Sequence, residues 1–212
     1  MVKFIIIRHG YSCANKTGRF AGATDAPLDE IGYKQAELTT EYILKNFKID
    51  AVYSSDLSRA YETVKAIADA FDLKVNKMKA LSEINVGLWE GKKLEEIEKE
   101  FPKSYDMYMN NHGITEFDGG ETYFDVIIRA KKAIEEIAKE NEGKTVVIGT
   151  HGGVIRAMQA AWSDCPLEEL KKATIVSNCS VTTAQYAHGK LSFTELSHES
   201  HLKDLLTQWH NI

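Results

Sequence analysis

The chain has 212 residues, of which 43% are hydrophobic and 27% are charged, as is typical of a soluble globular protein. One domain spanning residues 1–212 is expected at this length, which suffices to bury a self-supporting core. The formal net charge of −5 argues against a broad nucleic-acid-binding surface, and no run approaches the ~20 apolar residues of a membrane span, so we expect neither partner.

Short β-branched runs alternate with segments of helical periodicity along the chain. The runs predict strands at 2–7, 50–53, 75–78 and 145–149. The periodic segments predict helices at 29–47, 57–71, 92–111 (broken at Pro102), 123–141 and 154–162. Two alternating segments around His188-Gly189 predict a hairpin of residues 181–187 and 190–196. This order predicts an α/β protein with helices on both faces of a mainly parallel sheet and an antiparallel edge strand.

The first predicted helix follows a loop that is rich in Gly and polar residues and extends to about Pro27. Asp29 is expected to cap this helix at its N-terminus. One side of the helix is expected to be apolar and to face the core, with residues Ile31, Leu38, Tyr42 and Ile43.

Residues whose side chains could bind a ligand or take part in catalysis follow three of the predicted strands. Arg8-His9-Gly10 follows the first strand, Ser54 to Arg59 follows the second, and Thr150-His151-Gly152-Gly153 follows the strand at 145–149. In an open α/β sheet the ligand crevice lies outside the carboxyl ends of the strands. If these strands are parallel neighbours, Arg8, His9, Arg59 and His151 converge in one crevice.

Two arginines and two histidines in one crevice predict a site for a dianion. Arginine grips phosphate with two parallel bonds, and only five of the 26 Lys and Arg residues are arginines. A neutral imidazole can attack phosphorus, and backbone N–H groups at Gly152 can bind an anion. Taken singly, His9 and His151 are more simply explained as hydrogen-bonded structural residues. The combination of Arg-His-Gly after one strand and His-Gly-Gly after another is far more specific.

Further motifs occur in a fixed order along nearly the whole chain, namely Asn15, Gly22, Asp25, Leu28 and Gly32, then Ser54–Ala60 with Thr63, Leu81–Ile84, Gly87–Gly91, Gly119–Glu121, Thr150–Arg156 and Asn178–Val181. Together with Arg8-His9-Gly10 they resemble the histidine phosphatase superfamily, in its phosphoglycerate-mutase-like branch. This resemblance implies a three-layer α/β/α sandwich and a phosphomonoester hydrolase that needs neither a metal nor a cofactor.

The resemblance also implies catalytic roles. His9 would be the nucleophile that becomes phosphohistidine, and Arg8, Arg59 and His151 would form the phosphate pocket. Glu83 would be the general acid that protonates the leaving oxygen and then the base that activates water. The residues around Glu83 are apolar, and an apolar wall would help a carboxyl to hold its proton.

The resemblance implies a set of substrate-binding residues as well. Asn15 would touch the transferred phosphoryl group, Gly152 would bind it through the backbone, and Arg19, Gly22 and Thr24 would line the entrance. Three positions depart from the family pattern, namely Tyr11, Ala14 and Thr122. They lie at the substrate-facing rim, so they bear on specificity more than on chemistry.

The segment 92–120 is expected to form a helical, lid-like insertion. It carries four lysines, no arginine and seven acidic residues, and a bisphosphate bound there would meet repulsion. We therefore prefer a phosphatase that acts on a small sugar, ribosyl or glycerate phosphate, with a cofactor-dependent phosphoglycerate mutase as the alternative. The aromatic and Met side chains near this segment form either an apolar lid or a small core, namely Trp89, Tyr105, Met107, Tyr108 and Met109.

Other classes remain open at this stage. His9 and His151, or His198, His201 and His210, could ligate a metal, although spacing of this kind is a weak signal. The chain could also be a phosphate-binding protein without catalysis. A Cys-based phosphatase is disfavoured because no Arg-bearing phosphate loop follows Cys13.

The cysteines are sparse and odd in number, namely Cys13, Cys165 and Cys179. They do not resemble a disulfide framework, and we expect them to be packing residues of a cytoplasmic protein. The resemblance implies a monomer or a homodimer.

Overall fold

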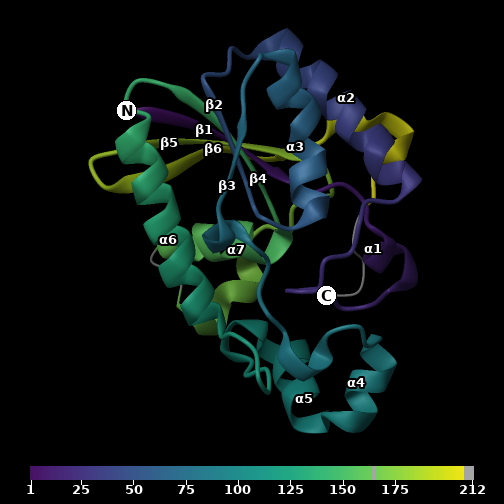
Figure 1. The fold of residues 1–212 in the computed structure, drawn as a ribbon. Coiled ribbons are helices and arrows are strands. Elements are labelled where there is room, and N and C mark those ends of the chain that lie inside the picture. Colours follow the sequence, from purple (N-terminus) through teal and green to yellow (C-terminus); the bar gives the residue numbers. More distant parts are fainter. Residues whose placement is uncertain (164–165, 208–212) are drawn as a thin grey trace.

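The computed structural model describes residues 1–163 and 166–207 around a central six-stranded sheet (Figure 1). The strand order is β3-β2-β4-β1-β5-β6. Parallel pairs join β1 to β4, β4 to β2 and β2 to β3, whereas β5 is antiparallel to both β1 and β6. The strands are β1 (Val2–Arg8), β2 (Ala51–Ser54), β3 (Val75–Lys77), β4 (Thr145–Thr150), β5 (Val181–Ala187) and β6 (Lys190–His198). The predicted α/β sheet, mainly parallel with an antiparallel hairpin at one edge, is confirmed.

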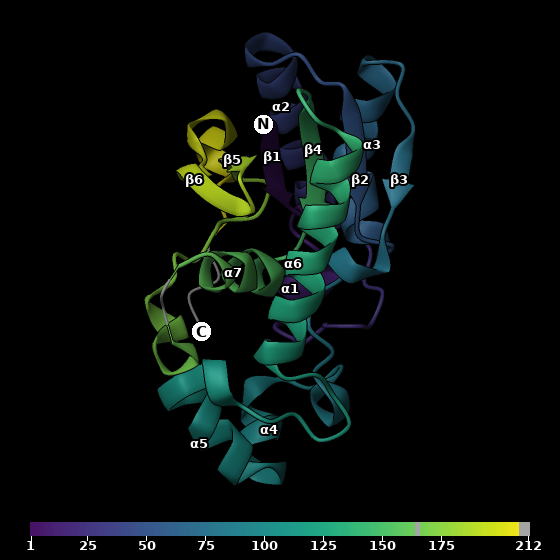
Figure 2. The same cartoon turned by 90° about the vertical axis from the view of Figure 1, so that its left-hand side faces the viewer.

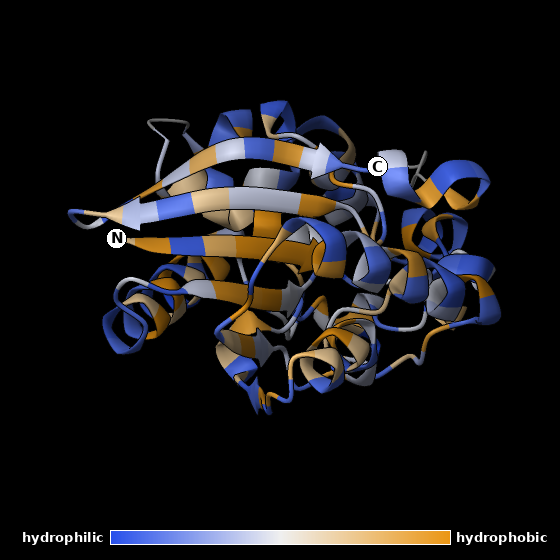
Figure 3. Cartoon of the chain, turned by 90° about the horizontal axis from the view of Figure 1, so that it is seen from above, coloured by the Kyte–Doolittle hydropathy of each residue, from blue (hydrophilic) through white to orange (hydrophobic). Residues whose placement is uncertain are grey.

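Helices cover both faces of this sheet, which gives three layers (Figure 2). Because side chains alternate across a strand, Ile5 and Ile7 of β1 pack with α2 (Glu30–Asn46) and α3 (Ser58–Ala70). On the other face, Phe4 and Ile6 pack with α6 (Tyr123–Glu140) and α7 (Gly152–Ala161). Seen from above, apolar residues run along the inner strands while the outer surfaces of the helices are polar (Figure 3).

The remaining helical segments are short. Pro102 occupies the first turn of α5, where its missing N–H costs no hydrogen bond, and so separates α5 from α4 as predicted. Both helices lie beyond the end of the sheet (Figure 1). The segments are α1 (Cys13–Thr17), α4 (Leu94–Glu100), α5 (Pro102–Asn111) and the 3₁₀ turns η1 (Lys79–Leu81), η2 (Gly87–Trp89), η3 (His112–Ile114), η4 (Leu167–Lys172) and η5 (Ser200–Leu205).

The buried side of α2 differs from the prediction. Asp29 does cap the helix, since its side chain accepts a hydrogen bond from the N–H of Ile31. However, Ile31 itself is exposed, and the buried side is small and partly polar, with Gly32, Gln35, Ala36, Thr39, Thr40 and Ile43. The physical reason is that this side packs against polar loop backbone: Gln35 accepts from the N–H of Tyr11 and donates to the carbonyl of Leu205.

Two helix starts were also misjudged. The helix α1 lies within the segment predicted as loop; at five residues it is too short to show periodicity, and Ser12 caps it with a hydrogen bond from Asn15. The helix α7 begins at Gly152, two residues before the predicted start, directly after the strand β4 and His151. No helix among the described residues is long and apolar enough to cross a membrane.

Candidate active site

Three neighbouring parallel strands end at one edge of the sheet and bring the predicted polar motifs together. The N–H of His9 binds the carbonyl of Thr150 at 2.8 Å, and the N–H of Ser55 binds the carbonyl of Gly149 at 2.9 Å, so the chain segments that leave β1, β2 and β4 stay in contact. The ring centroids of His9 and His151 lie 5.1 Å apart. The convergence that the strand ends predict is therefore present.

A pocket of about 130 Å³ opens at this edge. Most of the residues that the sequence predicted for the site line it, namely Arg8, His9, Asn15, Arg19, Gly22, Arg59, Glu83 and Gly152. Two do not. His151 is completely buried beside His9, and Thr24 contributes its carbonyl oxygen, which accepts a 2.8 Å hydrogen bond from Nη1 of Arg59.

The imidazole of His9 is held in one tautomer. Its Nδ1 lies 2.7 Å from the carbonyl oxygen of Gly10, and because a carbonyl can only accept, Nδ1 carries the hydrogen. Burial lowers the pKa of His9 well below its usual value, and the positive charges of Arg59 and Arg8 lower it further. The ring is therefore neutral near pH 7, and its Nε2 has a free lone pair.

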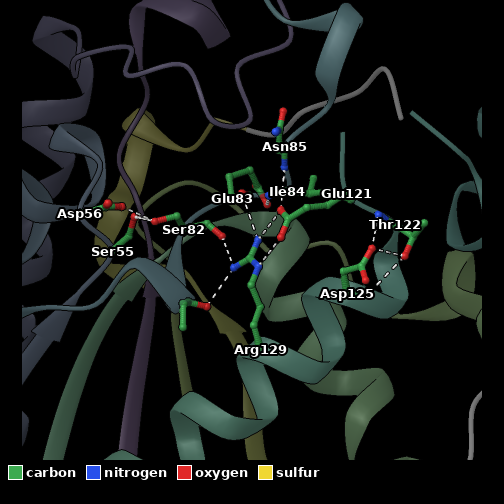
Figure 4. Close-up of polar contacts among 11 residues, drawn as sticks. Ser55, Asp56, Ser82, Glu83, Ile84, Asn85, Glu121, Thr122, Asp125 and Arg129 are labelled. Carbon is green, nitrogen blue, oxygen red and sulfur yellow. Dashed lines mark hydrogen bonds and ion pairs between the residues drawn. The ribbon is translucent and has the colours of Figure 1, made fainter. Parts of the chain in front are cut away.

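His151 is a second neutral imidazole. Burial lowers its pKa well below the usual value, and the charge of Arg59 adds to this effect. Its Nε2 lies 2.8 Å from Oγ of Ser55, which in turn lies 3.1 Å from Oγ of Ser82, and Ser82 donates to Asp56. Figure 4 shows the outer part of this chain, from Ser55 through Ser82 to Asp56. These bonds fix the ring of His151 next to that of His9.

Two buried guanidinium groups face the pocket and also bind the loops around it. Arg59 donates from Nη2 to the carbonyls of Ala21 and Gly22, each at 2.9 Å. Arg8 donates from Nη1 to the carbonyl of Val176 at 2.6 Å. Burial lowers the pKa of Arg8 to about 10 and lowers that of Arg59, yet both groups stay charged near neutral pH. Since neither forms an ion pair with a described residue, both positive charges are available to a bound anion.

The carboxylate of Glu83 lies at the start of α7. Its Oε2 accepts from the N–H of Gly153 at 3.1 Å and its Oε1 from the N–H of Ile84 at 3.0 Å. Two backbone N–H groups thus bind the carboxylate, while the apolar side chains of Ile84 and Val86 line the same pocket, and the effect of an apolar wall on the proton of Glu83 stays a prediction. Gly153 leaves room for this carboxylate, since a Cβ at this position would come within 2.5 Å of Oε1 and the side chain of Glu83 would have to shift.

The segment that carries Glu83 is clamped by Arg129 of α6 (Figure 4). The guanidinium donates to the carbonyls of Ala80 at 2.9 Å, Ser82 at 2.6 Å and Glu83 at 3.1 Å. Its Nε also forms an ion pair with Glu121 at 2.8 Å. Arg129 had no predicted role, because its partners lie 8 to 49 positions away along the chain. This clamp fixes the backbone that positions the carboxylate of Glu83.

The entrance of the pocket is built from the first loop and the segment 92–120. Oδ1 of Asn15 accepts from the N–H of Ser12 at 3.0 Å, so Asn15 is held at the start of α1. Arg19 donates to the carbonyl of Gly91 at 2.6 Å and pairs with Glu96 of α4.

The far wall of the pocket is aromatic. Trp89 packs edge-on against Phe20, Tyr108 and Phe117, with ring centroids 5.0 to 5.5 Å apart. Trp89 is fully buried, whereas the other three rings also line the pocket. These residues thus form a small core whose inner surface faces the pocket. Arg156, which the sequence did not single out as a site residue, lies in the same wall.

Several other residues that the sequence offered as candidates do not line the pocket. Ring stacking joins His198 and His201 to Tyr42, and no group of three or more potential metal ligands occurs in residues 1–163 and 166–207. Cys179 is buried as expected, but Cys13 is exposed, which contradicts a packing role. Cys165 and His210 lie outside the described residues. Of the departures from the family pattern, Thr122 caps α6 together with Asp125.

Residues 4–199 match the model of the histidine phosphatase superfamily (branch 1), and the chain belongs to this family. It is a phosphoric monoester hydrolase of the histidine phosphatase type. The chain is 37% identical over 161 residues to phosphoserine phosphatase 1 of Hydrogenobacter thermophilus, which covers 76% of each chain. It is 32% identical to the metal-independent phosphoserine phosphatase of Arabidopsis thaliana, over 97% of this chain and 85% of the other.

Solved structures are similar over almost the whole chain. Bacillus stearothermophilus YhfR superposes with a TM-score of 0.91 at 30% identity, covering 96% of this chain and 100% of that one. A phosphoserine phosphatase mutant from Entamoeba histolytica, solved in complex with phosphoserine, has a TM-score of 0.83 at 29% identity and covers 95% and 100% of the two chains. The predicted family and the predicted fold are both confirmed.

The neutral state of His9 makes the stability of the fold depend on pH. The unfolded chain binds a proton near the usual pKa of 6.5, whereas the folded ring stays neutral to lower pH. The free energy of unfolding therefore falls as the pH drops from about 6.5 toward the lowered pKa, by up to about 1.4 kcal/mol per pH unit for each such histidine. We expect His9→Gln to remove one such contribution, so that urea unfolding between about pH 7 and pH 5 shows a shallower slope. Equal slopes for both proteins would contradict a neutral buried His9.

Proposed function

We propose that the enzyme hydrolyses its phosphate ester through a phosphohistidine at Nε2 of His9. The observation that carries this proposal is the tautomer: Nδ1 is committed to the carbonyl of Gly10, which leaves Nε2 as the free lone pair beside two guanidinium groups. Arg8 and Arg59 neutralise the phosphoryl oxygens, and the first N–H groups of α7 at Gly152 add further donors.

The reaction has two steps in this proposal. In the first, Nε2 of His9 forms a bond to phosphorus, the ester P–O bond breaks, and Glu83 gives its proton to the leaving oxygen. In the second, Glu83 takes a proton from water, the water oxygen bonds to phosphorus, and the N–P bond breaks to release phosphate. His151 does not line the pocket, so we assign it a positioning role next to the ring of His9.

Small organic phosphates suit the size of the pocket. Two relatives are phosphoserine phosphatases, and the Entamoeba histolytica phosphatase was solved with phosphoserine and with 3-phosphoglyceric acid. These names support a substrate of that size for this chain. A phosphoglycerate mutase-like protein of Arabidopsis thaliana is also 33% identical over 74% of this chain. We favour hydrolysis over transfer because the segment 92–120 is net negative and would repel a bisphosphate.

We further propose that residues 1–212 act as one domain in which 92–120 is a lid. The ion pair between Arg19 and Glu96 ties this segment to the loop at the pocket entrance.

The free Cys13 and Cys179 are compatible with a reducing compartment, so we place the enzyme in the cytoplasm.

Phosphate release separates hydrolase from mutase. We expect the wild-type enzyme to liberate inorganic phosphate from a panel of phosphate monoesters without added 2,3-bisphosphoglycerate. Because His9→Ala removes the attacking nitrogen, we expect its turnover to fall by at least about 10⁴-fold, and circular dichroism checks that the variant is folded. Phosphate transfer that requires the bisphosphate, or turnover retained by His9→Ala, would contradict the proposal.

Dependence on the leaving group tests the proton donor. Glu83→Gln keeps the shape of the side chain but cannot give up a proton, so it should slow esters of alkyl alcohols by about 10²–10⁴-fold. The p-nitrophenolate ion leaves without protonation, so we expect kcat/KM for its phosphate ester to fall far less. The measurement is kcat/KM for wild type and variant across esters whose leaving groups differ in pKa. Losses that are equal for all esters would assign Glu83 another role.

A further inference from the structure

We propose that Asp56 is a positioning residue for the reaction, because it sets, through two hydroxyl groups, which nitrogen of His151 carries the hydrogen. The carboxylate of Asp56 is exposed, whereas the ring of His151 is completely buried. Ser82 and Ser55 connect the two, and Figure 4 shows the part of this chain from Asp56 to Ser55. The inference rests on the proposed function, since it concerns the histidine next to the nucleophile.

The direction of each hydrogen bond in this chain follows from the carboxylate. An ionised carboxylate can only accept, so the hydroxyl of Ser82 donates its one hydrogen to Asp56. Oγ of Ser82 must then accept, at 3.1 Å, from the hydroxyl of Ser55. Because the hydrogen of Ser55 is used in this way, its Oγ can only accept from Nε2 of His151, 2.8 Å away. The hydrogen of the neutral His151 ring therefore lies on Nε2.

A further contact of Ser55 agrees with this direction. Its Oγ also accepts a hydrogen bond of 3.2 Å from the backbone N–H of Leu57. A hydroxyl group has one hydrogen and two lone pairs. The hydrogen is used toward Ser82, and the two lone pairs are used toward Leu57 and His151. Ser55 therefore has no hydrogen left that could be donated to Nε2 of His151.

This assignment leaves Nδ1 of His151 as a lone pair without a hydrogen. The atom is buried and has no hydrogen-bond partner among the described residues, which is rare and calls for an explanation. His9 carries its hydrogen on Nδ1, so the two neighbouring rings adopt opposite tautomers. Besides burial, the groups that lower the pKa of His151 are Arg59, His9, Arg129 and Arg8.

The direction of the chain prepares His151 to gain and lose a proton at Nδ1. A proton gained there would leave every hydrogen of the chain in place, because Nε2 goes on donating to Ser55. If the chain ran in the opposite direction, Ser55 would donate to Nε2, and a proton could enter at Nε2 only after hydroxyl groups had turned. Groups that need no reorientation during a reaction are a main source of electrostatic catalysis. The ring centroids of His151 and His9 lie 5.1 Å apart, so this charge acts beside the nucleophile.

NMR of the histidine rings tests the tautomer directly. In enzyme labelled with ¹⁵N-histidine, two-bond ¹H–¹⁵N spectra near pH 7 distinguish a protonated ring nitrogen from a bare one, and His151→Gln identifies the signals of this ring. We expect the hydrogen on Nε2 in the wild type and in Asp56→Asn, whose amide oxygen can still accept from Ser82. In Asp56→Ala and in Ser82→Ala, the hydroxyl of Ser55 is free to donate to Nε2, so we expect the hydrogen of His151 to move to Nδ1.

The kinetic effect should follow the same order. We expect Asp56→Ala to lower kcat/KM for p-nitrophenyl phosphate by about three- to tenfold, the range for the loss of one hydrogen bond. Ser82→Ala should do the same, and the double variant should lose no more than either single variant, because both break one chain. Asp56→Asn should keep most of the activity. Asp69→Ala is the matched control, since it removes an exposed carboxylate of α3 that pairs with Lys65, and it should change kcat/KM by less than about twofold.

Four outcomes would overturn the inference. The first is a wild-type His151 with its hydrogen on Nδ1, which needs no variant. The second is a hydrogen that stays on Nε2 in both alanine variants. The third is an Asp56→Ala variant that loses no activity or loses as much as Asp56→Asn, and the fourth is additive losses in the double variant. The spectra require no turnover, so a wild-type enzyme that fails to hydrolyse p-nitrophenyl phosphate would count against the phosphatase function and not against the tautomer.

Discussion

The hydrogen bond from Nδ1 of His9 to the carbonyl oxygen of Gly10 fixes which ring nitrogen faces the reaction. Burial and two neighbouring arginines keep the same ring neutral, so the lone pair on Nε2 persists near pH 7. A protonated ring could not attack phosphorus, and the other tautomer would present an N–H to it. The phosphohistidine proposal depends on this one contact and on the sheet edge that buries it.

Arg8 and Arg59 hold the neighbouring loops in place and also supply positive charge to the pocket. Arg59 holds the loop at residues 21–24 through three carbonyls while its positive charge remains unpaired beside the pocket. Arg129 does the equivalent for the segment that carries Glu83. Gly22 belongs to this arrangement, because a Cβ there would come within 1.9 Å of the carbonyl oxygen of Ile84. Loops pinned in this way present preorganised donors and charges, which is the main source of catalysis in reactions of this kind.

The sequence predicted the sheet and the convergence at its edge because both follow from local signals. Triple Ile before Arg8 marks a strand buried on both faces, and parallel neighbours must end side by side. The predictions that failed concern features that depend on contacts between distant segments of the chain. The buried side of α2 follows the loop and the residues near Leu205 that it meets, so helical periodicity alone misplaced Ile31.

The surroundings of individual side chains were equally beyond local reasoning. The apolar neighbours of Glu83 in the chain did not reveal that the N–H of Gly153, 70 positions away, binds its carboxylate. Arg156 belongs to one of the family motifs, but its burial in the pocket was not predicted, because it arises only when α7 packs beside the aromatic wall.

The most direct test of the central claim is to identify the atom that carries the phosphoryl group. The enzyme labelled with ¹⁵N-histidine is mixed with a phosphate ester and quenched in alkali, and ³¹P–¹⁵N coupling in the denatured protein identifies the phosphorylated nitrogen. The account predicts phosphorus bonded to Nε2 of His9. Phosphorus on Nδ1, on another residue, or on no residue while turnover continues would contradict it.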